Sequence, residues 1–161
     1  MTTGAGTGGG SGAPGSRSVS VGVRLDAPPE RVWPLLAEVA RWPEWSFVTK
    51  GTLVRQGSPD PDGVGALRHL TVLGVGSREE VLAVTPPTHL AYAIRSGFPV
   101  RNHRADVTLA PDGTGTRLTW AARFDPVVPV AGPATDWLMR AVLTRFTTML
   151  ARHLAGRDGG A

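Results

Sequence analysis

The sequence contains no cysteine, so it can form neither a disulfide nor a thiolate metal site, and it offers no thiol nucleophile. No apolar run approaches the roughly 20 residues of a membrane-spanning helix, and the N-terminus lacks the basic and apolar regions of a signal peptide. Lys50 is the only lysine, and the arginines stand singly with acids between them, so the formal net charge of +4 forms no basic patch. We therefore expect a cytoplasmic protein without a membrane span and without nucleic acid as a partner.

The motifs of several enzyme classes are also missing. The chain has no nucleophile elbow, no phosphate-binding loop and no dinucleotide fingerprint, because the glycines near its N-terminus have no strand or helix around them. Its four histidines are isolated and lack the spacing of metal ligands. We expect no metal and no cofactor, and any catalysis would consist of proton transfer in a cavity that confines the substrate.

Composition divides the chain into a tail and one domain. Residues 1–17 are rich in glycine and serine, which is typical of disordered segments. Residues 18–156 are expected to form a single domain. Its most regular part is a helix predicted over residues 133–154, whose wide apolar face needs a sheet to pack against. The predicted apolar face consists of Leu138, Met139, Val142, Leu143, Phe146, Met149, Leu150 and Leu154.

Short segments with strand-like alternation occupy most of the remaining chain and are separated by turn residues. After the first of them, Pro28 and Pro29 begin a predicted helix in which Pro34 indicates a kink or a split, and residues 41–45 resemble a further helical turn. The pattern predicts an α+β fold with a seven-stranded antiparallel sheet. The predicted strands are residues 18–25, 47–56, 64–73, 77–85, 88–95, 102–110 and 115–124.

Alternation along the predicted strands assigns one face of the sheet to solvent and the other to the interior. Arg68 and Glu80 fall on the inner face of neighbouring strands, where they are either the polar end of a ligand site or a structural ion pair. Tyr92 is the only tyrosine, and it is either a proton donor or part of a cavity wall. His103 is either an acid or base or a packing residue.

Several motifs, taken in order, resemble the polyketide cyclase/dehydrase-like group of the SRPBCC (START-like, Bet v 1-like) superfamily over roughly residues 18–155. The resemblance implies a helix-grip fold, in which a curved antiparallel sheet wraps around the long last helix and two short helices follow the first strand. A ligand cavity would lie between sheet and helix. The motifs are residues 27–33 (APPERVW), 42–45 (WPEW), 63–68 (GVGALR), 79–81 (EEV) and 113–120 (GTGTRLTW).

The resemblance leads us to expect a protein that binds a small hydrophobic or aromatic metabolite. One alternative is a polyketide aromatase/cyclase in which Arg68 stabilises an enolate oxygen while Tyr92 or His103 exchanges protons. A further alternative is a non-catalytic interaction or regulatory protein. Phe98 and residues 126–129 are expected to rim the cavity. The predicted ligand-binding residues are Arg68, Leu70, Glu80, Leu82, Tyr92, Ile94, His103, Trp120, Leu138, Val142, Phe146 and Met149.

Overall fold

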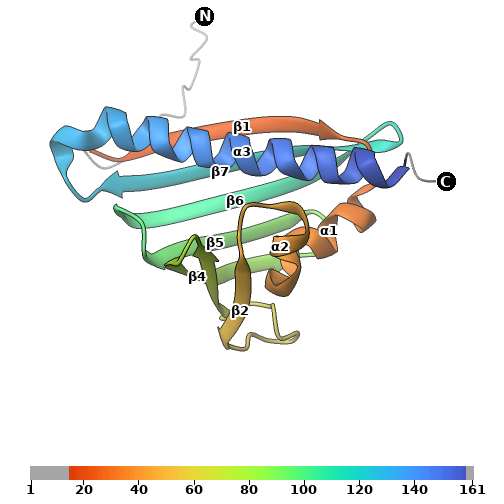
Figure 1. Ribbon diagram of the computed structural model, residues 1–161, viewed down its shortest axis with the longest axis horizontal. Helices are drawn as coiled ribbons and strands as arrows, with labels where there is room; N and C mark the ends of the chain where they lie inside the picture. Colours follow the sequence, from red (N-terminus) through yellow and green to blue (C-terminus); the bar gives the residue numbers. More distant parts are fainter. Residues whose placement is uncertain (1–14, 159–161) are drawn as a thin grey trace, which may run out of the picture.

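The structure, a computed structural model, describes residues 15–158, so most of the predicted disordered tail lies outside the described residues. Figure 1 shows a sheet with one long helix running across it. The strands are β1 (Arg17–Leu25), β2 (Lys50–Arg55), β3 (Leu67–Val72), β4 (Val75–Thr85), β5 (His89–Ser96), β6 (Val100–Asp112) and β7 (Gly115–Pro126). The α-helices are α1 (Pro29–Ala37), α2 (Trp42–Trp45) and α3 (Gly132–Asp158), and the 3-10 turns are η1 (Val39–Arg41) and η2 (Pro129–Ala131).

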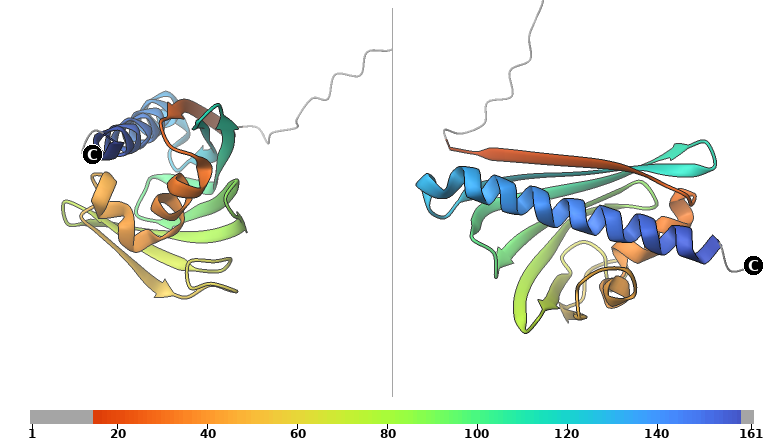
Figure 2. Two further views of the ribbon diagram at one scale, coloured as in Figure 1. Left: turned by 90° about the vertical axis from the view of Figure 1, so that its right-hand side faces the viewer. Right: turned by 45° about the horizontal axis from the view of Figure 1, so that its top comes forward.

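All seven strands form one antiparallel sheet in the order β1-β7-β6-β5-β4-β3-β2. The strands from β2 to β7 follow one another as hairpins, and β1 joins at the far edge by pairing with β7. Figure 2 shows the sheet curving so that α3 lies across its concave side. The predicted α+β class, the number of strands and the closing helix are confirmed, although β1 begins at Arg17, inside the segment predicted to be disordered.

α1 continues through Pro34 to Ala37, so it is not split at the proline. The extended residue Glu38 ends α1 and separates it from η1 and from α2, which is the predicted further helical turn. The last carbonyls of a helix have no partners within the helix and need other donors. Trp42 donates its indole N–H to the Leu36 carbonyl at 3.1 Å, and Trp45 donates to the Leu35 carbonyl at 2.9 Å. The WPEW motif therefore ties the end of α1 to α2, and it buries both indoles.

One side of α3 packs against the sheet, and it is fixed to β1 by polar contacts. Arg17 forms an ion pair with Asp136, and Arg140 donates to the backbone carbonyl of Ser20 at 3.2 Å. The buried face differs from the predicted one at several positions. Leu138 is 36% exposed at the margin of the apolar face, whereas Thr135 and Thr147 are buried, and the Thr147 hydroxyl donates to the Thr144 carbonyl at 3.0 Å. Among residues 15–158, no helix is long and apolar enough to span a membrane.

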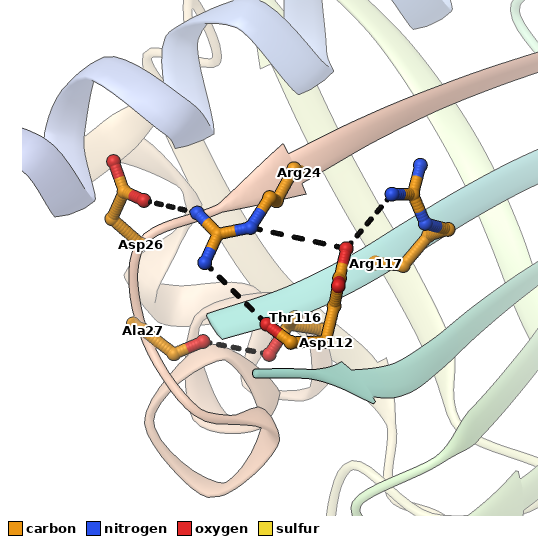
Figure 3. Close-up of polar contacts among 6 residues, drawn as sticks. All are labelled: Arg24, Asp26, Ala27, Asp112, Thr116 and Arg117. Atoms are coloured by element: carbon orange, nitrogen blue, oxygen red, sulfur yellow. Dashed lines mark hydrogen bonds and ion pairs between the residues drawn. The ribbon is translucent and has the colours of Figure 1, made fainter. Parts of the chain in front are cut away.

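A polar cluster closes the end of the sheet where β1 leaves and β6 turns into β7 (Figure 3). Arg24 lies between Asp26 and Asp112, and Arg117 pairs with the same Asp112 at 2.8 Å. Thr116, which is fully buried, donates its hydroxyl to the Ala27 carbonyl at 2.7 Å. This end of the sheet is thereby joined to the chain that leads into α1.

Candidate functional site

A cavity of about 380 Å³ lies between the concave face of the sheet and α3. Most of its lining is apolar and comes from β3, β5, α3 and the segment before β2. Leu73 in the β3–β4 turn is 89% exposed, and Val75 at the start of β4 is 67% exposed. Both lie at the mouth of the cavity, where Phe98 joins them from the β5–β6 loop. The lining residues are Phe47, Val48, Leu70, Val72, Leu73, Val75, Gly76, Ser77, Glu79, Tyr92, Ile94, Gly97, Phe98, His103, Met139, Val142, Leu143 and Phe146.

The turn at the mouth has an unusual backbone. Leu73 has φ +48° and Gly74 has φ +82°, so two consecutive residues adopt the left-handed conformation of a tight hairpin turn. Glycine adopts this conformation without a steric cost, whereas leucine does so at a cost of about 1–2 kcal/mol. The hairpin thus holds an apolar side chain in solvent at the edge of the cavity.

Arg68 and Glu79 form a buried ion pair beside the cavity. The β3–β4 register places them opposite each other, and the Arg68 Nη2 atom lies 3.0 Å from Glu79 Oε2. The Arg68 guanidinium is stacked 5.4 Å from the ring centres of both Trp42 and Tyr92, and Arg68 has no exposed surface. Burial raises the pKa of Glu79, and the charge of Arg68 opposes that rise. Only Glu79 of this pair lines the cavity.

The predicted inward position of Glu80 is wrong. Glu80 lies on the outer face, where its carboxylate is 2.8 Å from Arg95 Nε and 3.5 Å from Arg55 Nη2. The prediction took residues 74–76 as the turn, whereas Val72 pairs with Val75 across a shorter one, and this exchanges the faces of Glu79 and Glu80.

Leu82 is also displaced from its predicted position. A register shift between Val81 and Ala83 leaves Leu82 without a partner on β5, and Leu82 does not line the cavity. Such a bulge reverses the alternation of side chains along a strand. Before the bulge, the inner face of β4 is formed by Glu79 and Val81, because the shorter β3–β4 turn sets their register, although both were predicted to face solvent.

Tyr92 on β5 faces the cavity, and Trp120 on β7 lies behind it. The Trp120 indole N–H donates to the Tyr92 phenolic oxygen at 3.0 Å. Trp120 has no exposed surface and does not line the cavity, although it was predicted to do so. Burial raises the pKa of Tyr92 far above its usual range, so Tyr92 remains a neutral phenol.

His103 on β6 is a further polar group of the cavity. Its Nδ1 accepts the backbone N–H of Ile94 at 3.0 Å, so the proton of the neutral ring is on Nε2. Burial lowers the pKa of His103 to about 4. The imidazole is therefore neutral near pH 7 and presents an N–H donor.

Aromatic rings separate the cavity from the rest of the core. The Phe146 ring on α3 stacks on Phe47 with centroids 4.5 Å apart and on Trp120 with centroids 5.6 Å apart. Trp42 meets the same ring edge-on at 5.2 Å. Such offset and edge-on pairs add to the energy of apolar burial, so this side of the cavity has a closely packed aromatic wall.

The predicted ligand-binding residues divide into two groups. The structure brings six together around the cavity: Leu70, Tyr92, Ile94, His103, Val142 and Phe146. The other six do not line it: Arg68, Glu80, Leu82, Trp120, Leu138 and Met149. Met149 lies on the outward side of α3 instead, and residues 126–129 are absent from the rim.

Several lining residues were not predicted. Met139 and Leu143 belong to the predicted apolar face of the last helix, and that face was the signal for them. Glu79 was assigned to the wrong face, whereas Phe47 and Val48 precede β2 and show no periodicity. Among residues 15–158, no group of three or more histidine, aspartate or glutamate side chains is placed to hold a metal ion.

Solved structures share the fold. A START superfamily protein from Mycobacterium smegmatis superposes with a TM-score of 0.74 at 16% identity, covering 86% of this chain and 97% of that one. The Bacillus cereus protein XoxI gives 0.73 at 17% identity, covering 88% and 97%. A norcoclaurine synthase from Thalictrum flavum, bound to a transition-state analogue, gives 0.68 at 9% identity, covering 89% and 96%.

Sequence comparison supplies relatives and a family. An uncharacterized protein of Mycobacterium tuberculosis is 30% identical over 148 residues, which cover 86% of this chain and 85% of the relative. A protein of Mycobacterium bovis, also uncharacterized, matches to the same extent. Residues 16–155 match the family described as polyketide cyclase/dehydrase and lipid transport. Since that match spans the whole helix-grip domain, from β1 to the last turns of α3, the chain belongs to this family.

Proposed function

We propose that the protein binds one small, largely apolar molecule in the cavity between the sheet and α3. The observation that carries this proposal is the cavity itself, because protein interiors are packed as densely as organic crystals and leave few empty spaces. A volume of about 380 Å³ lies within the roughly 300–1,000 Å³ of small-molecule sites. The family description, which includes lipid transport, supports a hydrophobic ligand.

The lining supports binding because it combines apolar surface with few polar groups. Leu70, Ile94 and Val142 offer area to an apolar ligand, and this area contributes about 25 cal/mol per Å² removed from water. Glu79, Tyr92 and His103 supply the polar contacts that orient a ligand.

The electrostatics favour binding over proton-transfer catalysis. A general acid or base works best when its pKa lies near the working pH. The pKa of Tyr92 is raised and that of His103 is lowered to about 4, so both move away from neutrality. Arg68, proposed above for an enolate oxygen, has no exposed surface and meets Glu79 instead.

A fluorescence titration with the neutral dye N-phenyl-1-naphthylamine tests the proposal. Its emission should rise and saturate with the wild-type protein. Val142→Trp should weaken binding at least about tenfold, or about 1.4 kcal/mol, because the new ring occupies the cavity. Ala141→Trp is the matched control, since Ala141 is exposed on the outward side of α3.

Ala141→Trp should bind the dye as the wild type does. The proposal fails if the wild-type titration does not saturate. It also fails if Val142→Trp binds the dye as tightly as Ala141→Trp while both variants keep the wild-type thermal stability.

A further inference from the structure

The charge that faces the cavity is negative. Within the described part of the chain, Glu79 is the only lysine, arginine, aspartate or glutamate that lines the cavity, and its side chain is 10% exposed. Its partner Arg68 has no exposed surface, since Trp42 and Tyr92 cover the guanidinium. A ligand in the cavity therefore meets the carboxylate and not the guanidinium.

Part of the Glu79 carboxylate is available to a ligand. The Oε2 atom accepts the bond from Arg68, and within residues 15–158 the Oε1 atom receives no hydrogen bond. Oε1 is also not among the fully buried unpaired atoms, so it retains contact with the open space. A carboxylate oxygen accepts hydrogen bonds and donates none, which makes Oε1 an acceptor for a donor on the ligand.

Two donors lie on β5 and β6, the two strands that come after β4 in the sheet. The Nε2 atom of His103 carries the proton of the ring, because Nδ1 is occupied by the Ile94 N–H. Tyr92 accepts from Trp120, and its own hydroxyl proton has no acceptor within residues 15–158. On β4 the cavity thus offers the Glu79 acceptor and the Ser77 hydroxyl, and it offers donors on β5 and β6.

An anionic ligand would be poorly accommodated by this lining. Moving an ionised carboxylate out of water costs several kcal/mol unless a counter-charge compensates, and among residues 15–158 no cationic side chain lines the cavity. The Glu79 carboxylate adds repulsion, which is strong where water is excluded. A hydroxyl has no charge to lose and donates one hydrogen bond while accepting others.

We infer that the cavity selects a neutral, mainly apolar molecule carrying a hydroxyl that donates to Glu79 Oε1 and accepts from His103 or Tyr92, and that it rejects carboxylates. This inference rests on the proposed binding function, and it reverses the sequence-based expectation that Arg68 would receive an anionic oxygen. It assigns the polar end of the ligand to β4, β5 and β6, and the apolar body to the space under α3.

Three ligands of one ring system test the inference in the wild-type protein. These are 2-naphthol, 2-methoxynaphthalene, which lacks the donor, and 2-naphthoate, which is ionised at pH 7. Displacement of N-phenyl-1-naphthylamine gives each Kd. The Kd of 2-naphthol should be at least about tenfold lower than that of 2-methoxynaphthalene, because a lost hydrogen bond leaves buried groups unpaired, and 2-naphthoate should bind most weakly.

The residue responsible is tested by Glu79→Gln, which preserves shape and removes the charge. The Kd of 2-naphthoate relative to that of 2-naphthol should fall at least about tenfold. Glu80→Gln is the matched control, because it makes the same change at the adjacent position on the outer face and should leave the ratio unchanged. If Glu79→Gln does not fold, Arg68→Gln combined with Glu79→Gln replaces both buried charges and should shift the ratio in the same direction.

The outcomes separate this inference from the proposed function. Equal binding of 2-naphthoate and 2-naphthol by the wild type overturns the inference, and so does an unchanged ratio in a folded Glu79→Gln variant. If the dye binds but none of the three naphthalenes displaces it, the hydroxyl selectivity is overturned while the binding function stands. If the dye itself does not bind, both fail.

Discussion

Trp120 donates its indole N–H to the phenolic oxygen of Tyr92 over 3.0 Å, from the strand next but one in the sheet. Both rings are buried, and they meet nearly perpendicular to each other at an interplanar angle of 86°. Tyr92 thus provides the acceptor for a core residue and also lines the cavity, which connects the stability of the core to the chemistry of the cavity.

Tyr92→Phe should lower the free energy of unfolding by about 1–3 kcal/mol, because it leaves the buried Trp120 N–H without an acceptor. Urea unfolding followed by circular dichroism measures the change. A loss below about 0.5 kcal/mol would show that the indole finds another acceptor and would contradict the role given to this bond.

Removing one partner of the buried pair Arg68 and Glu79 should destabilise the protein far more than removing one partner of the exposed pair Arg95 and Glu80. Arg68→Met should cost about 3–5 kcal/mol, since Glu79 then keeps a buried charge without a partner. Arg95→Met should cost less than about 1 kcal/mol, because that pair is solvated. Chemical denaturation of both variants gives the comparison, and equal losses would be inconsistent with the burial of Arg68.

A double variant that removes both charges of the buried pair completes this test. Combining Arg68→Met with Glu79→Leu removes both buried charges, and it should recover most of the stability that Arg68→Met loses. If the double variant is no more stable than Arg68→Met, loss of packing by the Arg68 side chain, and not the unpaired Glu79 charge, explains the effect.

Stability should decline as the pH falls from about 6.5 towards 4. In the unfolded chain His103 takes up a proton near its ordinary pKa of 6.5, whereas burial delays protonation of the folded protein to a pKa of about 4. The unfolded state thus binds more protons across this interval, so acid favours unfolding by up to about 3 kcal/mol from this group.

The contribution of His103 to this pH dependence is measured by comparing the wild type with variants. Unfolding free energies at pH 7 and pH 4.5 should differ less in His103→Gln, which retains an acceptor for the Ile94 N–H. His69→Gln on the outer face leaves His103 untouched and should retain the wild-type decline. An equal decline in His103→Gln and the wild type would refute the assignment to His103.

Replacing either of two glycines by alanine should change the stability of the protein, in opposite directions for the two positions. A Cβ on Gly51 of β2 would collide with the Val39 backbone carbonyl, so Gly51→Ala should cost about 1–3 kcal/mol. A Cβ on Gly156 in α3 meets open space, so Gly156→Ala should add up to about 1 kcal/mol. Thermal unfolding should order the proteins as Gly51→Ala, wild type and Gly156→Ala. Any other order would contradict the close approach of η1 to β2.

The strands and helices were predictable because their signals are local. The last helix carries a long apolar periodicity, and each strand of the sheet ends at turn residues such as Asp112 and Gly113. These features depend on neighbours in the sequence, so one chain was enough to place them within a few residues. Pro28 and Pro29 likewise indicated the start of α1, which begins at Pro29.

The lining of the cavity was less predictable, because it depends on register and depth. One residue more or less in the β3–β4 turn decides whether Glu79 or Glu80 faces inward, and composition does not reveal that count. Arg68 and Trp120 do point inward, but other side chains cover them. Alternation along a strand predicts the face of the sheet on which a side chain lies. It does not predict whether that side chain reaches the cavity or is covered by its neighbours.

The pairing of β1 with β7 has a consequence for how the chain reaches this structure. Arg17 and its partner Asp136 are 119 positions apart, and Ala27 and Thr116 are 89 positions apart. During synthesis β1 must wait for β7 and α3 before it has a partner, so its assembly cannot be completed while the C-terminal third is still missing. Contacts of such long range slow folding, and we expect refolding on the order of milliseconds to seconds. The cavity, which needs α3 as one wall, would be among the last features to form.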